Sequence, residues 1–227
     1  MHLLEHYNSL YQASKKEILA GKYGIDLQID STADDRFGIT LLIRPDAHVK
    51  RNIQAFLHEL KQVEPTQYYY PDSDLHVTAM SIISCYSGFR LEGICIEDYV
   101  RVIKESLIGI APFKIEFRGV TASPSAVMIQ GFPCNASLHN LRNNLRYHFQ
   151  QSGLEESIDK RYAISTAHVT VARFRDKLQG APRFVNTLEK YREYLFGQHT
   201  VDRLELVCND WYQRAQYVKK LHHFDLG

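Results

Sequence analysis

Two short segments with the same pattern of histidine and threonine could carry acid–base chemistry. His76-Val-Thr78 and His168-Val-Thr170 lie 92 residues apart in the chain. Each segment has the character of a β-strand, in which successive side chains point to opposite faces, so each histidine shares a face with its threonine. Two imidazoles that face each other across a groove can act as an acid and a base near neutral pH. The repeated pattern therefore predicts a metal-free catalytic pair, and no ligand spacing in the sequence suggests a metal site.

The residues before the two motifs also match. When the histidines are aligned, Tyr70 aligns with Tyr162 and Ser73 aligns with Ser165. Both tyrosines are expected in loops that overhang the groove, where a phenol ring could stack on a base or bond a phosphate. The alternative is that each ring packs against the sheet where its strand begins. The sequence leaves both alternatives open.

The two motifs lie within a duplicated order of elements. The first copy, residues 37–120, is expected to contain a strand at 37–43, an amphipathic helix at 47–63, the first motif strand, a helix at 96–108 and a strand at 113–117. The second copy, residues 126–210, is expected to contain a strand at 126–132, a helix at 136–151, the second motif strand, a helix at 182–196 and a strand at 201–208. A final strand near 216–225 is expected to form a hairpin with 201–208.

This order predicts an α+β fold with duplicated strand-helix-strand lobes and pseudo-two-fold symmetry. Two antiparallel sheets are expected to meet around a central cleft, with the helices outside and the two motifs facing each other. Residues 37–226 are expected to form a single bilobal domain. Residues 1–36 are expected to add a helix at 3–20 and a connection, which have no counterpart in the duplication. The helix could close the cleft, mediate dimerisation or cap the core.

The composition is that of an ordinary globular protein. The chain has 227 residues, of which 44% are hydrophobic, and a formal charge of +1 from 27 basic and 26 acidic residues. It contains no long basic block, which argues against a binder of long duplex nucleic acid. The four cysteines form no Cys-x-x-Cys pair, so we expect reduced thiols. Since no signal segment or membrane span is evident, we expect a cytoplasmic protein with no membrane partner, and a monomer.

Paired His-x-Thr strands in a duplicated unit of this kind resemble the two-histidine (2H) phosphoesterase superfamily, which contains LigT-like RNA ligases and cyclic nucleotide phosphodiesterases. The resemblance implies that His76 and His168 are catalytic, with His168 favoured as the base and His76 as the acid. It also implies that Thr78 and Thr170 hydrogen-bond the phosphate oxygens. Arg173 stands where many LigT-like proteins carry a basic residue. Simple alternation places Arg173 on the face opposite His168, so a ligand contact requires a strand bulge, and the alternative is a structural ion pair.

The leading functional hypothesis is a metal-independent phosphodiesterase that needs no cofactor. Its substrate would be a cyclic phosphate or 2′-5′ type phosphodiester of a nucleotide, RNA end or related small molecule. A non-catalytic nucleotide or RNA-end binding module is one alternative, and a sugar isomerase, which would leave the paired threonines unexplained, is another. A 2′-5′ RNA ligase is a third, and it would need a longer basic track. Such a track requires several arginines to converge in space: Arg142, Arg146, Arg161, Arg173, Arg175 and Arg183.

Overall fold

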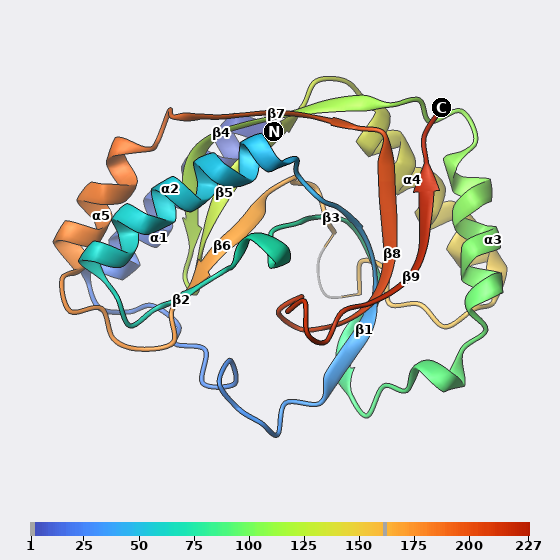
Figure 1. Ribbon diagram of the computed structural model, residues 1–227, viewed down its shortest axis with the longest axis horizontal. Helices are drawn as coiled ribbons and strands as arrows, with labels where there is room; N and C mark the ends of the chain where they lie inside the picture. Colours follow the sequence, from blue (N-terminus) through green and yellow to red (C-terminus); the bar gives the residue numbers. More distant parts are fainter. Residues whose placement is uncertain (1–2, 161–162) are drawn as a thin grey trace.

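Helices and strands alternate along most of the chain, as the duplicated pattern predicts. A computed structural model describes residues 3–160 and 163–227 (Figure 1). The helices are α1 (Leu3–Leu19), α2 (Ala47–Val63), α3 (Ile96–Leu107), α4 (Ser137–Ser152) and α5 (Ala181–Lys190). The strands are β1 (Arg36–Ile43), β2 (Tyr68–Tyr69), β3 (Val77–Ser87), β4 (Phe113–Ser123), β5 (Ala126–Pro133), β6 (Val169–Arg173), β7 (Leu195–Val201), β8 (Arg203–Asp210) and β9 (Lys219–Asp225).

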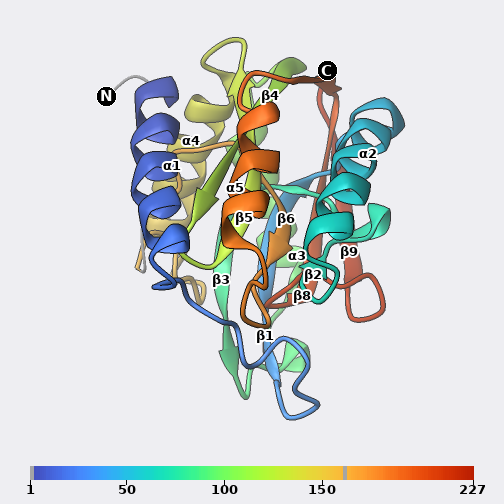
Figure 2. The same cartoon turned by 90° about the vertical axis from the view of Figure 1, so that its left-hand side faces the viewer.

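The strands form one antiparallel nine-stranded sheet with the order β7-β4-β5-β6-β3-β1-β8-β9, and β2 pairs with β6. The halves of this sheet join where Val77 of β3 pairs with Val169 of β6. Helices α1, α2 and α5 lie side by side along one half (Figure 2), and α3 and α4 accompany the other half. The α+β class is thus confirmed, and the two expected sheets are the two halves of a single curled sheet.

Each half of the sheet contains strands from both sequence copies. The last strand of the first copy, β4, pairs with β5 from the second copy. In the same way β8, which ends the second copy, pairs with β1 from the first copy. The copies therefore exchange their final strands, and neither half of the sheet is complete without the other copy.

The expected helix at 182–196 is wrong in its second half. Helix α5 ends at Lys190, and the residues from Leu195 to Val201 form β7, which pairs with β4. Gly197 has a φ of 130°, which no α-helix can accommodate. Phe196 and Val201 are buried, whereas Gln198 and Thr200 between them are exposed, so the burial of the two apolar side chains stabilises the strand at the edge of the sheet.

The N-terminal helix is confirmed as α1, and it is fixed against the half of the sheet that contains β4 and β5. Ser14 donates a hydrogen bond to the carbonyl of Ala122 at 2.8 Å, and Thr121 donates one to the carbonyl of Tyr7 at 3.0 Å. Both contacts are buried and join residues more than one hundred positions apart. Among the helices that the structure describes, none is both long enough and apolar enough to cross a bilayer.

Gly131 of β5 allows the backbone just before the second motif to lie close to β5. A Cβ atom at this position would overlap the carbonyl of Ala167, the residue that precedes His168. Gly131→Ala is therefore expected to lower the free energy of unfolding by about 1–3 kcal/mol, as overpacking of a buried site does. Urea denaturation checks this, with Gly93→Ala as the control, because among the described atoms none lies within 4 Å of the Cβ that this second substitution adds. Equal stability of the two variants would contradict the prediction.

Candidate active site

The two His-x-Thr motifs meet at the centre of the sheet. Strands β3 and β6 are antiparallel and pair at Val77 and Val169. By this register His76 lies opposite Thr170, and Thr78 lies opposite His168. Directly opposite residues of antiparallel strands have Cα atoms about 4.5–5.5 Å apart. The pairing therefore gathers two imidazoles and two hydroxyl groups into one patch with local two-fold symmetry.

A cavity of about 190 Å³ lies over this patch. Its lining includes the predicted site residues that the structure describes: His76, His168, Thr78, Thr170, Tyr70 and Arg173. Further lining comes from residues that the sequence patterns did not single out, including Ser81 and Ser84 of β3 and Asn209, Trp211 and Gln213 at the end of β8 and beyond it. The pairing of β8 with β1 brings these last residues to the cavity, and no local pattern marks them.

Each catalytic candidate uses its Nδ1 atom for a hydrogen bond. His76 Nδ1 lies 2.7 Å from the carbonyl oxygen of Asp74, which can only accept, so Nδ1 carries the proton. His168 Nδ1 lies 2.7 Å from Thr166 Oγ1, a hydroxyl that can donate or accept. In both residues Nε2 is consequently the nitrogen left for a substrate.

Burial lowers the pKa of both histidines from 6.5 to about 4. For His76 the hydrogen bond to the Asp74 carbonyl acts in the opposite direction and favours the protonated ring. The guanidinium group of Arg173 lowers both pKa values further, together with that of Arg44 for His76 and that of Arg142 for His168. Both rings are thus neutral at pH 7 in the free protein, and His76 alone of the two has a backbone acceptor that partly offsets the effect of burial.

The low pKa values predict a loss of stability in weak acid. Each histidine binds a proton more weakly in the folded protein, with a pKa of about 4, than in the unfolded chain, with a pKa of about 6.5. The unfolded state therefore takes up more protons between these values, so this part of the stability is fully present above pH 6.5 and is lost toward pH 4. Urea denaturation at pH 7, 6 and 5 should show a smaller decline in the double variant His76→Gln, His168→Gln than in the wild type. An equal decline in both proteins would contradict the assignment.

A β-bulge brings Arg173 to the cavity. Met128 of β5 pairs with Thr170, whereas the neighbouring Val127 pairs with Ala172, so Val171 is an extra residue in β6. The bulge reverses the alternation beyond Thr170 and places Arg173 among the residues that line the cavity. The simple alternation expected from the sequence is therefore wrong at this point.

Tyr70 supports Arg173 from the wall of the cavity. Its hydroxyl accepts a hydrogen bond from Arg173 Nε at 2.9 Å, and its side chain is only 2% exposed. Arg173 Nη1 also lies 3.9 Å from Asp26. A ring so deeply buried has little surface for stacking on a base, so packing against the sheet describes Tyr70 better. Its predicted counterpart, Tyr162, lies outside the described residues.

Arg142 of α4 joins the two motif strands from behind. Its Nη2 atom donates to the carbonyls of Thr78 at 2.9 Å and Thr166 at 2.8 Å, and its Nε atom donates to the carbonyl of Ala79 at 2.9 Å. The residue is 4% exposed, and burial lowers the pKa of its guanidinium to about 10, so it remains charged at pH 7. In the sequence the signal for this role is an arginine within the apolar stripe of a helix, which also contains Leu138.

The other arginines considered for a basic track have different partners. Arg146 lies 2.5 Å from Asp159, and Arg175 lies 3.3 Å from Asp30. Arg161 lies outside the described residues. Carboxylates therefore balance two of these positive charges, and Arg142 is buried.

Comparisons with known proteins bear on the family and the fold of this chain. The 2′-5′ RNA ligase superfamily matches residues 49–210. No curated protein matches the chain. TT0787 of Thermus thermophilus has a TM-score of 0.58 and 19% identity, covering 84% of this chain and 97% of its own. E. coli LigT complexed with 3′-AMP has a TM-score of 0.58 and 14% identity, covering 84% of this chain and 98% of its own.

A third solved structure extends the similarity to more of the chain. The conserved protein of unknown function ATU0111 from Agrobacterium tumefaciens str. C58 has a TM-score of 0.61 and 15% identity, and it covers 92% of this chain and 98% of its own. At these identities the three structures establish the fold alone, whereas the family match spans most of the chain, including both motifs. The chain therefore belongs to the 2′-5′ RNA ligase superfamily of two-histidine phosphoesterases.

Proposed function

We propose that this protein is a metal-independent phosphodiesterase that hydrolyses a cyclic phosphate of a nucleotide or an RNA end. The observation that carries the proposal is the pairing of Val77 with Val169, which sets both histidines and both threonines around one cavity. An acid and a base on opposite sides of a phosphorus atom can activate water and protonate the departing oxygen within a single step.

In this proposal His168 is the base and His76 is the acid. Nε2 of His168 accepts a proton from water as the water oxygen forms a bond to phosphorus. His76, protonated once the anionic substrate is bound, donates a proton from Nε2 to the ribose oxygen as its bond to phosphorus breaks. The Asp74 carbonyl supports this assignment, because it accepts a hydrogen bond from Nδ1 of His76 and so favours the protonated ring.

Three further residues would stabilise the negative charge on phosphorus. Thr78 and Thr170 line the cavity on either side of the paired valines, where their hydroxyls can donate to the non-bridging oxygens. Arg173 supplies a positive charge at the same cavity, held in place by Tyr70. Fixed donors of this kind act without reorganisation during the reaction, which makes them effective in catalysis.

The comparisons support a nucleotide substrate. The E. coli LigT structures include complexes with 3′-AMP and with phosphate. The description of the family also favours a second candidate, the hydrolysis or formation of a 2′-5′ phosphodiester bond. The same acid and base serve this reaction, because microscopic reversibility exchanges their roles in the direction of ligation.

Turnover in the presence of EDTA tests the proposal. The purified protein is incubated with 2′,3′-cyclic mononucleotides, RNA with a 2′,3′-cyclic end, a 2′-5′ linked dinucleotide and cyclic dinucleotides, and the products are separated by chromatography. Hydrolysis of any of these without metal supports the proposal, and the product identifies the bond that was cleaved. Binding without turnover of all substrates would overturn it in favour of a non-catalytic nucleotide or RNA-end binding module.

A further inference from the structure

Helix α1, which stands outside the duplicated unit, is anchored next to the second motif. The hydroxyl of Tyr7 accepts hydrogen bonds from the backbone nitrogen of Ala167 at 3.3 Å and of Gly131 at 3.4 Å, and it donates to the carbonyl of Gly131 at 3.3 Å. Ala167 directly precedes His168 in the chain. A buried side chain of α1 thus holds the backbone at the catalytic candidate, and the helix has a fixed position beside it.

The anchored helix forms one wall of a groove that opens onto the catalytic cavity. This groove has a volume of about 640 Å³, and His6, Tyr7 and Leu10 of α1 line it. It shares Thr78, His168, Thr170 and Arg173 with the catalytic cavity. The two hollows are therefore continuous at the proposed position of the phosphate.

The volumes of the catalytic cavity and the α1 groove indicate different roles for them. The catalytic cavity, at about 190 Å³, is smaller than the roughly 300–1,000 Å³ that is typical of ligand sites, whereas the α1 groove, at about 640 Å³, falls within this range. The catalytic cavity has room for a phosphate and a water molecule. The larger part of a nucleotide must then lie elsewhere, and the groove is adjacent.

The walls of the groove indicate what it can bind. Leu10 and Met128 provide apolar surface, and Ser123, Ser125 and Thr166 provide hydroxyl groups that can donate or accept. Arg173, where the groove meets the catalytic cavity, is the permanently charged side chain among the described residues of its lining. Such a surface suits an uncharged moiety with one flat apolar face and several polar atoms, as a base and its ribose present, better than it suits a second phosphate.

We infer that the groove between α1 and the β4–β5 hairpin is the nucleoside subsite of the enzyme. The base lies against Leu10 and Met128, and the attached phosphate reaches His168 and Arg173 at the junction. This inference rests on the proposed function, and it assigns to α1 a direct contact with the substrate.

Binding measurements test the subsite without relying on turnover. Isothermal titration calorimetry compares inorganic phosphate with adenosine 3′-monophosphate, which differ by the nucleoside. In the wild type the nucleotide is expected to bind at least about tenfold more tightly, because the groove adds apolar burial to the phosphate contacts. Leu10→Trp, which fills the groove, is expected to bring the Kd values of phosphate and nucleotide close together. His6→Ala, which adds no bulk, is expected to reduce the difference between these two Kd values.

Gln12→Ala is the matched control, because Gln12 is an exposed residue on the same helix and does not line the groove. It should retain the full preference for the nucleotide. An unchanged preference for the nucleotide in both Leu10→Trp and His6→Ala would overturn the inference. A variant that bound phosphate and nucleotide equally more weakly would also overturn it, because α1 would then only support His168. Circular dichroism verifies that each variant is folded. If the protein showed no turnover but its preference for the nucleotide depended on Leu10, the proposed hydrolysis would be refuted and the nucleoside subsite would be supported.

Discussion

Replacement of His76 or His168 by alanine is expected to lower kcat on a 2′,3′-cyclic nucleotide by about 10²–10⁴-fold, the usual contribution of a general acid or base. The two residues act in the same step, so the double variant should be little slower than the worse single variant. Neither variant should bind the substrate much more weakly, because Thr78, Thr170 and Arg173 retain their contacts with the phosphate. Steady-state kinetics, with KM and kcat determined separately, checks this result.

The control for this experiment is a histidine far from the cavity. His58 lies exposed on α2 and is absent from the lining of the cavity, so His58→Ala should have the kinetics of the wild type. A retained kcat in either His76→Ala or His168→Ala would refute acid–base catalysis by this pair. If both variants lost substrate binding rather than kcat, the histidines would be recognition residues.

Arg142→Met is expected to cost at least about 3 kcal/mol of stability, because it leaves one buried and two partly buried carbonyl groups without this donor, and hydrogen bonds to charged groups contribute about 1.5–3 kcal/mol each. These carbonyls belong to Thr78, Ala79 and Thr166, so the substitution removes hydrogen bonds from both motif segments at once. Catalysis should suffer as well, since His168 is held by the hydroxyl of the same Thr166. Denaturant unfolding and kcat, measured on the same preparation, check both effects.

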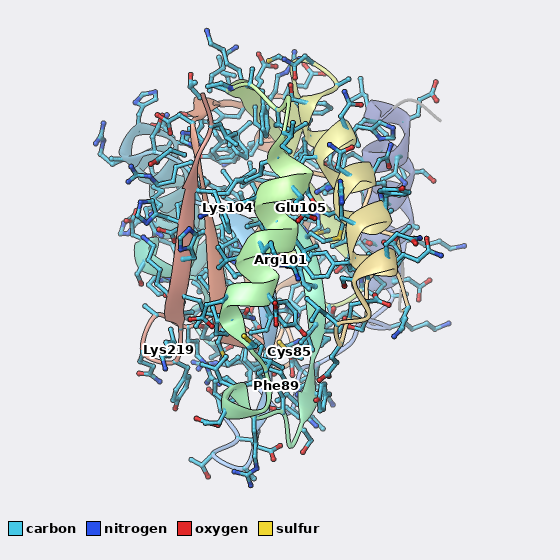
Figure 3. The ribbon with its side chains drawn as sticks, turned by 90° about the vertical axis from the view of Figure 1, so that its right-hand side faces the viewer. Cys85, Phe89, Arg101, Lys104, Glu105 and Lys219 are labelled. Atoms are coloured by element: carbon cyan, nitrogen blue, oxygen red, sulfur yellow. The ribbon has the colours of Figure 1, made fainter. Side chains whose placement is uncertain are left out.

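The matched control is an arginine on the surface. Arg101 lies on the outer helix α3 (Figure 3). It forms exposed ion pairs with Asp98 and Glu105. Arg101→Met should change the stability by less than about 0.5 kcal/mol, as surface substitutions usually do. Arg142→Lys should recover only part of the loss, because a lysine cannot reproduce the planar fork of donors that spans two strands. If Arg142→Met were as stable as Arg101→Met, the two strands would not depend on this guanidinium.

The order of elements and the catalytic candidates follow from local sequence patterns alone. The apolar spacing predicts α2 over residues 47–63, and the helix has these bounds. Local periodicity suffices for this, because an amphipathic helix buries one face wherever it packs. The repeated His-x-Thr pattern likewise identified His76 and His168 as partners, since a duplicated strand displays the same residues on the same face.

Where a local pattern was ambiguous, tertiary contacts decided the outcome. The sequence predicts a helix as far as residue 196, yet α5 ends at Lys190 and Leu195–Val201 form β7, because β4 offers an edge with which to pair. Arg173 faces the cavity because its strand, pairing with β5, accommodates Val171 as a bulge. Neither the partner strand nor its register is encoded within a window of neighbouring residues, so periodicity cannot supply them.

The surroundings of the histidine pair are determined mainly by the tertiary structure. The exchange of β4 and β8 between the two copies brings Asn209 and Gln213 to the cavity, and the docking of α1 places Leu10 beside it. Arg142 can donate to the carbonyls of both Thr78 and Thr166 only because its helix packs against the segments that carry the two motifs. The sequence specified which residues could perform the chemistry, because residue type and alternation are local properties. The groove beside α1 arises from contacts between segments distant in the chain, and those contacts exist only in the folded protein.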